Sequence, residues 1–441
     1  MNKRLPFWLR HVMYNLRGGF LLRPLIIALA LGFAGAVLSW VEESFPLLSE
    51  FVPRALFPSH DDPQVAQVIL AGIAQSIMTV VSIVFAILLM TLTLASMQFS
   101  PRIIVSFSKD RVTQWTLGLF LGTFCYCMAA LPTARSLPHP FAPVSTVFGA
   151  MLLALTCVAL LLYFIHHISH AISVNHIVDR IAAETEAIID DVMPLPRRTA
   201  SLVQSVAAEL NTWDFPLVSE ASGYIRFIDT HRLVTLARLA QVKVHVVRKV
   251  GHFVPEGAPL LMAYKGDRLT LQSRSEILDA FDLGPSRTLQ QDVEFGVLQI
   301  VDIALKAISP AVNDPTTAVN CVDQLSRILI RFGARELPAS ILYGPPGTAR
   351  VSIPWIDFEG LLKSAFHQIR LYSKTDLAVS LRMLRALGDI AWTRPEPSLR
   401  RALYEEGRRI VEGCAEKLGE EELRPMRDRL AALEKLVNIA Q

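Results

Sequence analysis

The stretch VAQVILAGIAQSIMTVVSIVFAILLMTLTLASM, residues 65–97, decides the fold of this chain. It contains no charged side chain, and the uncharged run around it extends from Asp62 to Arg102. A helix that crosses the hydrocarbon core of a bilayer needs about 20 mostly apolar residues. The stretch is longer than that, so it predicts a transmembrane helix that is tilted or projects beyond the membrane.

Three further segments fit a membrane span. Residues 24–41 and 115–131 are apolar, and the second of these ends before Pro132. A fourth span begins near Val144, and its helical pattern continues past the membrane to residue 193, where Pro194 and Pro196 follow. The sequence therefore predicts four transmembrane helices within residues 1–175, followed by a helical connector over 176–215.

The charges of the loops predict how the spans are oriented. The segment before the first span is basic, whereas the loop between the first two spans holds five acidic residues and only Arg54 as a base. The next loop is basic again, with Arg102, Lys109 and Arg111. Basic residues are retained on the cytoplasmic side. We therefore expect both termini in the cytoplasm and the chain in a bacterial inner membrane, with the lipid bilayer as its first partner.

Composition excludes several classes of protein. Charged residues make up 19% of the 441 residues, below the roughly 25% of a soluble domain, and the apolar excess lies mostly before His176. The net charge of +3 gives no support for a nucleic-acid partner. The five cysteines show no spacing typical of disulfides or a zinc site. No nucleotide-binding loop or nucleophile motif is present, so we expect neither a cofactor nor an enzymatic activity.

The second half of the chain has a mixed pattern. Short alternating runs with turn signals predict a β-rich region over residues 216–287. The phrase VGHFVPEGAPLL, residues 250–261, resembles the strand–turn–strand of a lipoyl-type half-barrel, although no lysine matches the position that carries that cofactor. Helical periodicity predicts a helical domain over 288–441, with helices at 290–308, 315–332, 358–371, 377–392, 397–417 and 420–439. The expected fold is thus a membrane α-helical part followed by a cytoplasmic α+β part that combines a β half-barrel with a helical bundle.

A polar stripe runs along the longest predicted span. Its candidate pore-lining residues are Gln75, Thr79, Ser82, Thr93 and Ser96. At about 100° per residue they fall within roughly 60° of one line along a helix. Hydroxyl and amide groups in such a line could border a water-filled path, or they could let helices approach and bond to one another. A GxxxG pattern at Gly118 and Gly122 also predicts a helix contact.

Histidines cluster where the fourth predicted span leaves the membrane. His166 and His170 share one helix face, a spacing that can hold a metal ion between two imidazoles. They could also sense pH, since histidine titrates near neutrality, or simply face lipid headgroups.

The densest polar segment of the second half is a candidate ligand or ion site. Its residues are Asp292, Glu294, Asp302, Asn313 and Asp314. The carboxylates could supply oxygen ligands to a cation. Asp314 followed by Pro315 is also a strong helix start, so the segment could instead form a rigid capped corner between two helices.

Several motifs in order resemble those of a known family. They are QFSPR (98–102), LGLFLGTF (117–124), YFIHH (163–167), GYI (223–225) and SPAVNDP (309–315). The chain in this respect resembles domain-of-unknown-function family 2254, a bacterial family of predicted membrane proteins. The resemblance implies an inner-membrane protein and brings no activity or catalytic residue with it.

Few spans, a polar stripe and a large soluble region predict a homo-oligomeric pore or ion channel with a regulatory cytoplasmic domain, with inorganic ions as further partners. The competing hypothesis is a non-conducting membrane sensor or scaffold, whose cytoplasmic domain binds a ligand or a protein. No Asp, Glu, Lys or Arg lies deep in a span. That absence argues against a proton- or ion-coupled transporter.

Overall fold

The computed structural model describes residues 22–45, 62–98, 110–135, 141–171, 173–195, 215–393 and 396–438. The chain divides into two compact units, Met1–Ser173 and Val174–Gln441. The first holds four helices that are long and apolar enough to cross a membrane. The second is a mixed α+β unit, as the sequence predicts.

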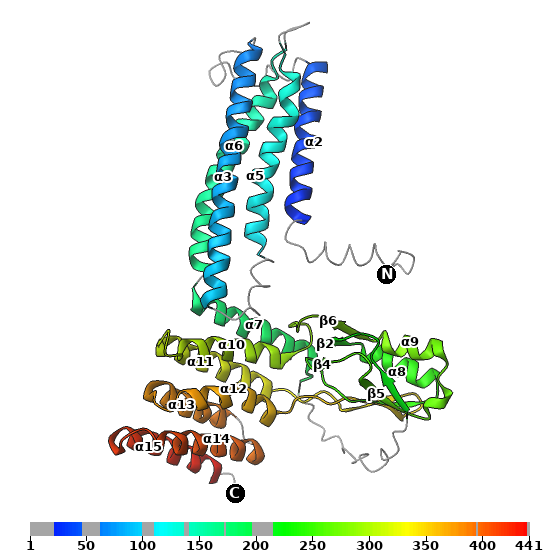
Figure 1. Ribbon diagram of the computed structural model, residues 1–441, viewed down its shortest axis with the longest axis vertical. Helices are drawn as coiled ribbons and strands as arrows, with labels where there is room; N and C mark the ends of the chain where they lie inside the picture. The colour runs from blue at the N-terminus through cyan, green and yellow to red at the C-terminus, as the bar shows by residue number, and fades with distance from the viewer. Residues whose placement is uncertain are drawn as a thin grey trace. The chain divides into compact units, whose positions relative to one another are not determined.

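The N-terminal unit is a bundle of helices that run alongside one another (Figure 1). Its elements are α2 (Leu22–Ser44), α3 (Pro63–Gln98), α5 (Arg111–Ala130), the short η2 (Leu131–Thr133) and α6 (Val144–Ala171). Glycines let α2 and α5 approach closely. A Cβ atom added to Gly35 would lie 2.6 Å from the carbonyl oxygen of Tyr126, and one added to Gly122 would lie 2.4 Å from the side chain of Leu31. The GxxxG pair of α5 therefore packs against α2.

The expected continuous helix from residue 144 to residue 193 is two helices. It is divided between α6, which ends at Ala171, and α7 (Val174–Val192). The two segments differ in pattern, because α6 is apolar nearly all round whereas α7 has one apolar face. That face buries Ile177, Ile181 and Ile189 within the C-terminal unit. Each helix thus suits a different environment, and the helix is interrupted where the sequence pattern changes.

The strands of the C-terminal unit form two sheets and no closed barrel within the described residues. One sheet has the strand order β1-β5-β3-β8-β7 and the other β4-β2-β6. The strands are β1 (Phe215–Val218), β2 (Gly223–Ile228), β3 (Lys243–Val246), β4 (Phe253–Val254), β5 (Pro259–Tyr264), β6 (Phe281–Gly284), β7 (Ile341–Gly344) and β8 (Thr348–Ser352). The strand–turn–strand phrase at residues 250–261 is therefore not a hairpin, since β4 pairs with β2 and β5 pairs with β1 and β3.

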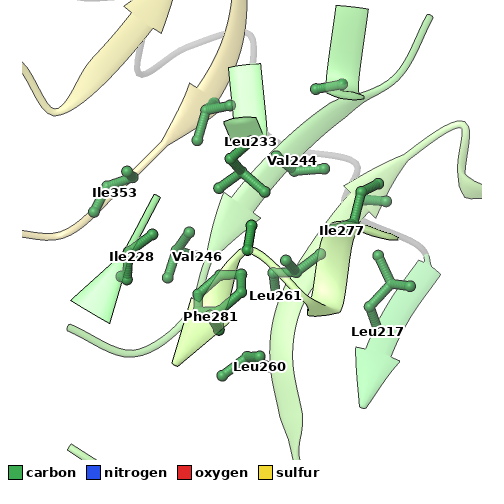
Figure 2. Packing of buried hydrophobic residues seen from close by; sticks show 14 of the residues in the cluster. Leu217, Ile228, Leu233, Val244, Val246, Leu260, Leu261, Ile277, Phe281 and Ile353 are labelled. Atoms are coloured by element: carbon green, nitrogen blue, oxygen red, sulfur yellow. The ribbon is translucent and has the colours of Figure 1, made fainter. Parts of the chain in front are cut away.

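One strand pair comes from the part of the chain that the sequence predicts to be helical. The antiparallel hairpin β7–β8 adds to the larger sheet through β8, which pairs in parallel with β3 at Val244 and Val351. The sheet is thus completed by a segment far along the chain. Its core, drawn in Figure 2, packs Val244, Val246 and Leu261 against Ile353 and the helix residue Leu233.

The remaining helices cover the sheets or pack on one another. They are α8 (Thr230–Leu239), α9 (Leu271–Leu278), the short η4 (Gly266–Arg268), α10 (Val293–Ala307), α11 (Pro315–Gly333), α12 (Phe358–Tyr372), α13 (Leu377–Thr393), α14 (Pro397–Ala415) and α15 (Glu420–Asn438). The last six begin and end within three residues of the predicted bounds. Side-chain caps fix several of the starts: Asp292 accepts a hydrogen bond from Phe295 N, Asp314 accepts one from Thr317 N, and Asp357 accepts one from Gly360 N.

Candidate functional site

The polar stripe of α3 lies on the outer face of the N-terminal unit. Gln75, Thr79, Ser82 and Thr93 are all exposed, while the opposite face of the helix buries Ala74, Ile77, Val81 and Val84. The structure describes the backbone of Ser96 but not its side chain. No helix among the described residues of this chain therefore covers the stripe.

The hydroxyl groups of the stripe are bonded within their own helix. Thr79 donates to the carbonyl oxygen of Gln75 at 3.1 Å, Ser82 donates to Met78 at 3.0 Å, and Thr93 donates to Leu89 at 2.8 Å. The carboxamide of Gln75 makes no hydrogen bond to another described side chain. An amide in hydrocarbon without a partner costs several kcal/mol. The Gln75 side chain therefore requires water or a second molecule.

In the histidine cluster, His167, between the two predicted residues, has a partner outside its own helix. His166 is exposed, and the side chain of His170 lies outside the described residues. His167, between them, points to α5, and its Nε2 lies 3.1 Å from Oδ2 of Asp110. The partner comes from a distant part of the sequence, so no local pattern could identify the pair.

Asp110 caps α5 and holds it to α6. Its Oδ2 accepts hydrogen bonds from the backbone N–H and the hydroxyl of Thr113, at 2.9 and 2.6 Å. Burial alone would raise the pKa of Asp110, but the hydrogen bonds from Thr113 and the charge of His167 outweigh it and lower the pKa. No group of three His, Cys, Asp or Glu side chains in the described part of the chain could hold a metal ion.

A second carboxylate that the sequence did not single out caps the other end of α6. Glu42, at the end of α2, is 1% exposed. It accepts hydrogen bonds from Ser145 N at 2.6 Å and from Thr146 N at 3.0 Å. A carboxylate at a helix N-terminus is favoured by the free N–H groups and by the helix dipole. Glu42 and Asp110 thus fix α6 to its neighbours at both of its ends.

Two residues of the predicted ligand site form a charge cluster in the C-terminal unit. Arg287 donates from Nε to Asp292 Oδ2 at 2.8 Å and from Nη2 to Asp292 Oδ1 at 2.9 Å. Glu294 accepts from Ser364 at 2.8 Å and lies 3.2 Å from Lys249 Nζ. Burial would raise the pKa of Glu294, but Ser364, Lys249 and Arg287 together lower it. For Asp292, burial outweighs the arginine and raises the pKa.

Gly251 makes room for this cluster. It has a φ of +87°, and an added Cβ would lie 2.2 Å from Asp292 Oδ2. Any other residue would therefore meet both backbone strain and a direct clash.

A small cavity of about 40 Å³, partly open to solvent, adjoins the cluster. Its polar side is formed by Lys249, Gln291, Asp292 and Glu294. Its apolar walls come from residues next to these and from three other stretches of the chain: Val192, Met193, Val250, Val293, Phe332, Leu337, Pro338, Pro354, Trp355 and Ile356. The sequence could not indicate this pocket, because its walls are distant from Asp292 along the chain.

The other residues of the predicted ligand site do not join the cluster. Asp302 lies further along α10 and is half-buried. Asn313, with a φ of +49°, and Asp314 lie beyond the end of α10, roughly 20 Å from Asp292 at 1.5 Å per helical residue. Asp314 is the cap of α11, and its hydrogen bonds from Thr317 lower its pKa. The five residues therefore belong to three separate places.

Comparison with known proteins places the chain in a family. The model of a family described as predicted membrane protein (DUF2254) matches residues 17–389. An uncharacterized protein of Mycobacterium bovis and one of Mycobacterium tuberculosis are each 30% identical to the chain over 406 residues, which cover 91% of this chain and 77% of each relative. No solved structure matches the chain significantly. With most of its length matched in sequence and four membrane-length helices at its N-terminal end, the chain belongs to the DUF2254 family of predicted membrane proteins.

Proposed function

We propose that the chain forms a homo-oligomeric, passive ion pore in a bacterial inner membrane, without enzymatic activity, and that its C-terminal unit is cytoplasmic and regulates the pore. The observation that carries the proposal is the exposed polar stripe on α3. Four of its five predicted residues have described side chains, and all four lie on the surface of the single chain. In a bilayer this face would be turned to lipid unless other subunits or water covered it.

Energetics favour a covered stripe. Apolar side chains suit lipid, and the exposed face of α6 has them, with Leu155, Val158 and Leu162 more than half exposed. The exposed face of α3 also has apolar side chains such as Leu89, but its stripe adds an amide and several hydroxyls. Beside them lies Gly72, where an added Cβ would meet nothing within 4 Å. Small and polar residues are enriched where membrane helices meet, and they also border water-filled paths. Subunits arranged with α3 facing a common axis would satisfy both needs.

The side chains of the stripe favour a pore over a coupled transporter. Residues 63–98 contain no ionisable side chain. Transporters that move protons or couple ions usually hold one within a span. Hydroxyl and amide oxygens can replace part of the hydration shell of an ion without trapping it.

The connection between the units supports regulation. Only residues 172 and 173 separate α6 from α7. In turn α7 is held on α11 by ion pairs of Arg327 with Asp179 at 2.8 Å and with Glu186 at 2.6 Å, and by pairs of Arg331 and Arg335 with Asp190. Exposed pairs are each weak, but the buried isoleucines of α7 add to them. A movement of the helical bundle would therefore carry α7 with it and pull on α6.

Ion flux into proteoliposomes tests the proposal. The native chain should conduct, and Ser82→Trp should reduce the flux at least tenfold because the indole fills the proposed path. Leu155→Trp, on the apolar face of α6, is the matched control and should conduct like the native chain. Oligomeric state and unfolding of both variants should be measured alongside. Absence of flux from the native chain at every pH and salt gradient tried, or equal flux from Ser82→Trp, would overturn the pore.

The pocket beside Glu294 favours a second candidate function. A chain that binds a ligand there and conducts no ions would be a membrane sensor or scaffold, with α7 carrying the signal. Ligand binding without flux would support this alternative over the pore.

A further inference from the structure

A seven-residue repeat runs along the exposed side of α3. From Val68 onward, exposed residues recur at alternating steps of four and three, which is the spacing of the two core positions, a and d, of a coiled coil. Eight residues form this axial line: Val68, Gly72, Gln75, Thr79, Ser82, Ala86, Leu89 and Thr93. All except Val68 and Leu89 are small or polar.

The opposite side of α3 shows what such a repeat does in this chain. It follows the same alternation of four and three through Leu70, Ala74, Ile77, Val81 and Val84, which are all buried in clusters with residues of α5 and α6. The buried repeat therefore has its partners within the N-terminal unit. The axial line has no such partner helix among the described residues.

Large apolar side chains border the axial line on both sides. Met78, Phe85 and Leu92 each precede a member of the line, at heptad position g. Ile83 and Met90 each follow a member, at position e. All five are exposed in the single chain. A face for lipid alone needs no division into a small, polar line and two apolar borders, whereas a face for other helices does.

The borders of neighbouring copies are complementary. Copies of one membrane protein insert in the same orientation, so their α3 helices are parallel around a common axis. In a parallel bundle, the side chain at g lies beside the side chain at e of the next heptad on the neighbouring helix. This rule pairs Met78 with Ile83 of the partner subunit, and Phe85 with Met90 of the partner subunit. Thioether and aromatic groups attract one another.

The axial line and its borders thus have separate tasks. With g and e side chains packed between neighbours, the hydroxyl groups and the amide of Gln75 face the axis of the ring. There, water or the same residues of other copies supply the hydrogen bonds that lipid cannot.

We infer that the α3 helices of several copies form a parallel ring, in which Met78 and Phe85 of each copy pack against Ile83 and Met90 of its neighbour. A seven-residue repeat gives such a ring a left-handed supercoil. The inference rests on the proposed homo-oligomer and goes beyond it, because it fixes which side chains of neighbouring copies meet.

Disulfide cross-linking between two differently tagged copies tests this register. Both are full-length chains whose five native cysteines are replaced. One carries Met78→Cys and the other Ile83→Cys, and the mixture is reconstituted into proteoliposomes and oxidised with copper phenanthroline. The mixed 78–83 dimer should form several-fold faster than the 78–78 or 83–83 dimer, because a g side chain in a ring meets only the e side chain of its neighbour.

The matched control shifts the level and keeps the side of the helix. Residue 90 lies on the same border as residue 83, one heptad or about 10 Å further along α3. Met78→Cys with Met90→Cys should therefore cross-link several-fold more slowly than the 78–83 pair. Phe85→Cys with Met90→Cys provides the second expected contact and keeps the test decisive if a variant of the first pair does not fold.

Three results would overturn the inference: equal rates for 78–83 and 78–90, faster formation of 78–78 than of 78–83, or no cross-link of any pair. Ion flux through the native chain separates this outcome from that of the pore. The expected cross-links in a chain that conducts no ions would support the ring and count against the pore. Flux without any of these cross-links would overturn the ring and leave the pore standing.

Association in detergent gives a second measurement. Phe85→Ala removes an aromatic ring from the contact with Met90 of the partner subunit, and it should weaken association about tenfold. Phe33→Ala is the matched control, because Phe33 on α2 is also exposed and lies outside the proposed contact; it should associate like the native chain. A Phe85→Ala chain that associates as tightly as the native chain would contradict the contact.

Discussion

Helices α3 and α5 are both apolar and both carry polar side chains. On α5 these side chains are buried within the chain, whereas the stripe of α3 is exposed. On α5, Thr116 and Thr123 are completely buried, and Thr123 donates to the carbonyl oxygen of Leu119 and lies 3.3 Å from the sulfur of Cys157 on α6. On α3, Gln75, Thr79 and Ser82 are exposed. Half of the α5 span is buried within the chain, against 22% of the α3 span.

The difference shows that polar residues in a span can serve either of two purposes. On α5 they join helices of one chain, and glycines bring the backbones together. On α3 they lie where no described part of the chain can reach them. Hydroxyl-bearing residues occur along both helices, so only the packing distinguishes a contact within one subunit from a surface available to water or to another subunit.

The largest expected effect is a difference in stability between a valine substitution at a glycine of α2 and one at a glycine of α3. Gly35→Val places side-chain atoms against the backbone of Tyr126 on α5, and we expect it to destabilise the N-terminal unit by about 1–3 kcal/mol or more. At Gly72 on α3 an added Cβ meets nothing within 4 Å in the single chain, so Gly72→Val should leave the stability nearly unchanged. Unfolding in mixed detergent micelles measures both. A destabilised Gly72→Val monomer would show that the α3 face is covered within the chain after all.

Removal of the N-terminal cap of α5 or of α3 should have an intermediate effect on stability, and the effect at α5 should depend on pH. Asp110→Ala removes the cap of α5 and the contact with His167, at a cost of about 1 kcal/mol near pH 7. Asp62→Ala on α3 should cost less, since its contact with Gln64 N is exposed and water can replace it.

The sign of the pH dependence follows from the pKa of Asp110, which is lower in the folded state. Its contribution is fully present above the unfolded pKa of about 3.9, and it is lost as the pH falls through the lower folded value. The difference in unfolding free energy between the native protein and Asp110→Ala should therefore be smaller near pH 3 than at pH 7. A difference in unfolding free energy that grows in acid would contradict this role of Asp110.

The smallest expected effect concerns association. Gln75→Leu removes the unpartnered amide of α3 and should weaken subunit association by about 0.6 kcal/mol per contact, the average for a hydrogen bond between membrane helices. Thr123→Val on α5 should cost a similar amount of stability within one chain and leave association unchanged. Sedimentation equilibrium in detergent measures association, and unfolding measures stability. The comparison of α3 with α5 would fail if Gln75→Leu lowered stability without weakening association and Thr123→Val did the reverse.

Much of the fold could be predicted from sequence because its signals are local. Apolar runs indicated the four spans, and caps such as Asp314 before Pro315 marked helix starts. The β7–β8 hairpin was missed because its Gly344-Pro345-Pro346-Gly347 turn looks like a plain loop, and its pairing with β3 joins residues more than one hundred positions apart.

The sites were predicted only where the residues are close in sequence. Asp292 and Glu294 were identified together, whereas Lys249, Arg287 and Trp355 reach them only through the fold. Likewise, the contact of His167 depends on Asp110, which is distant in the sequence and precedes another helix. Glu42 looked like part of an acidic loop, and its role is visible only when α6 begins beside it.

The most direct test of the exposed stripe is its access to water in the membrane. In a chain whose five cysteines are replaced, Ser82→Cys is treated with a charged, membrane-impermeant thiol reagent, with Leu155→Cys on the lipid-suited face of α6 as the reference. A water-filled path along α3 predicts rapid modification of residue 82 and almost none of residue 155. Modification of residue 82 as slow as that of residue 155 would show that the stripe faces lipid or a dry helix contact, and the pore would have to be abandoned.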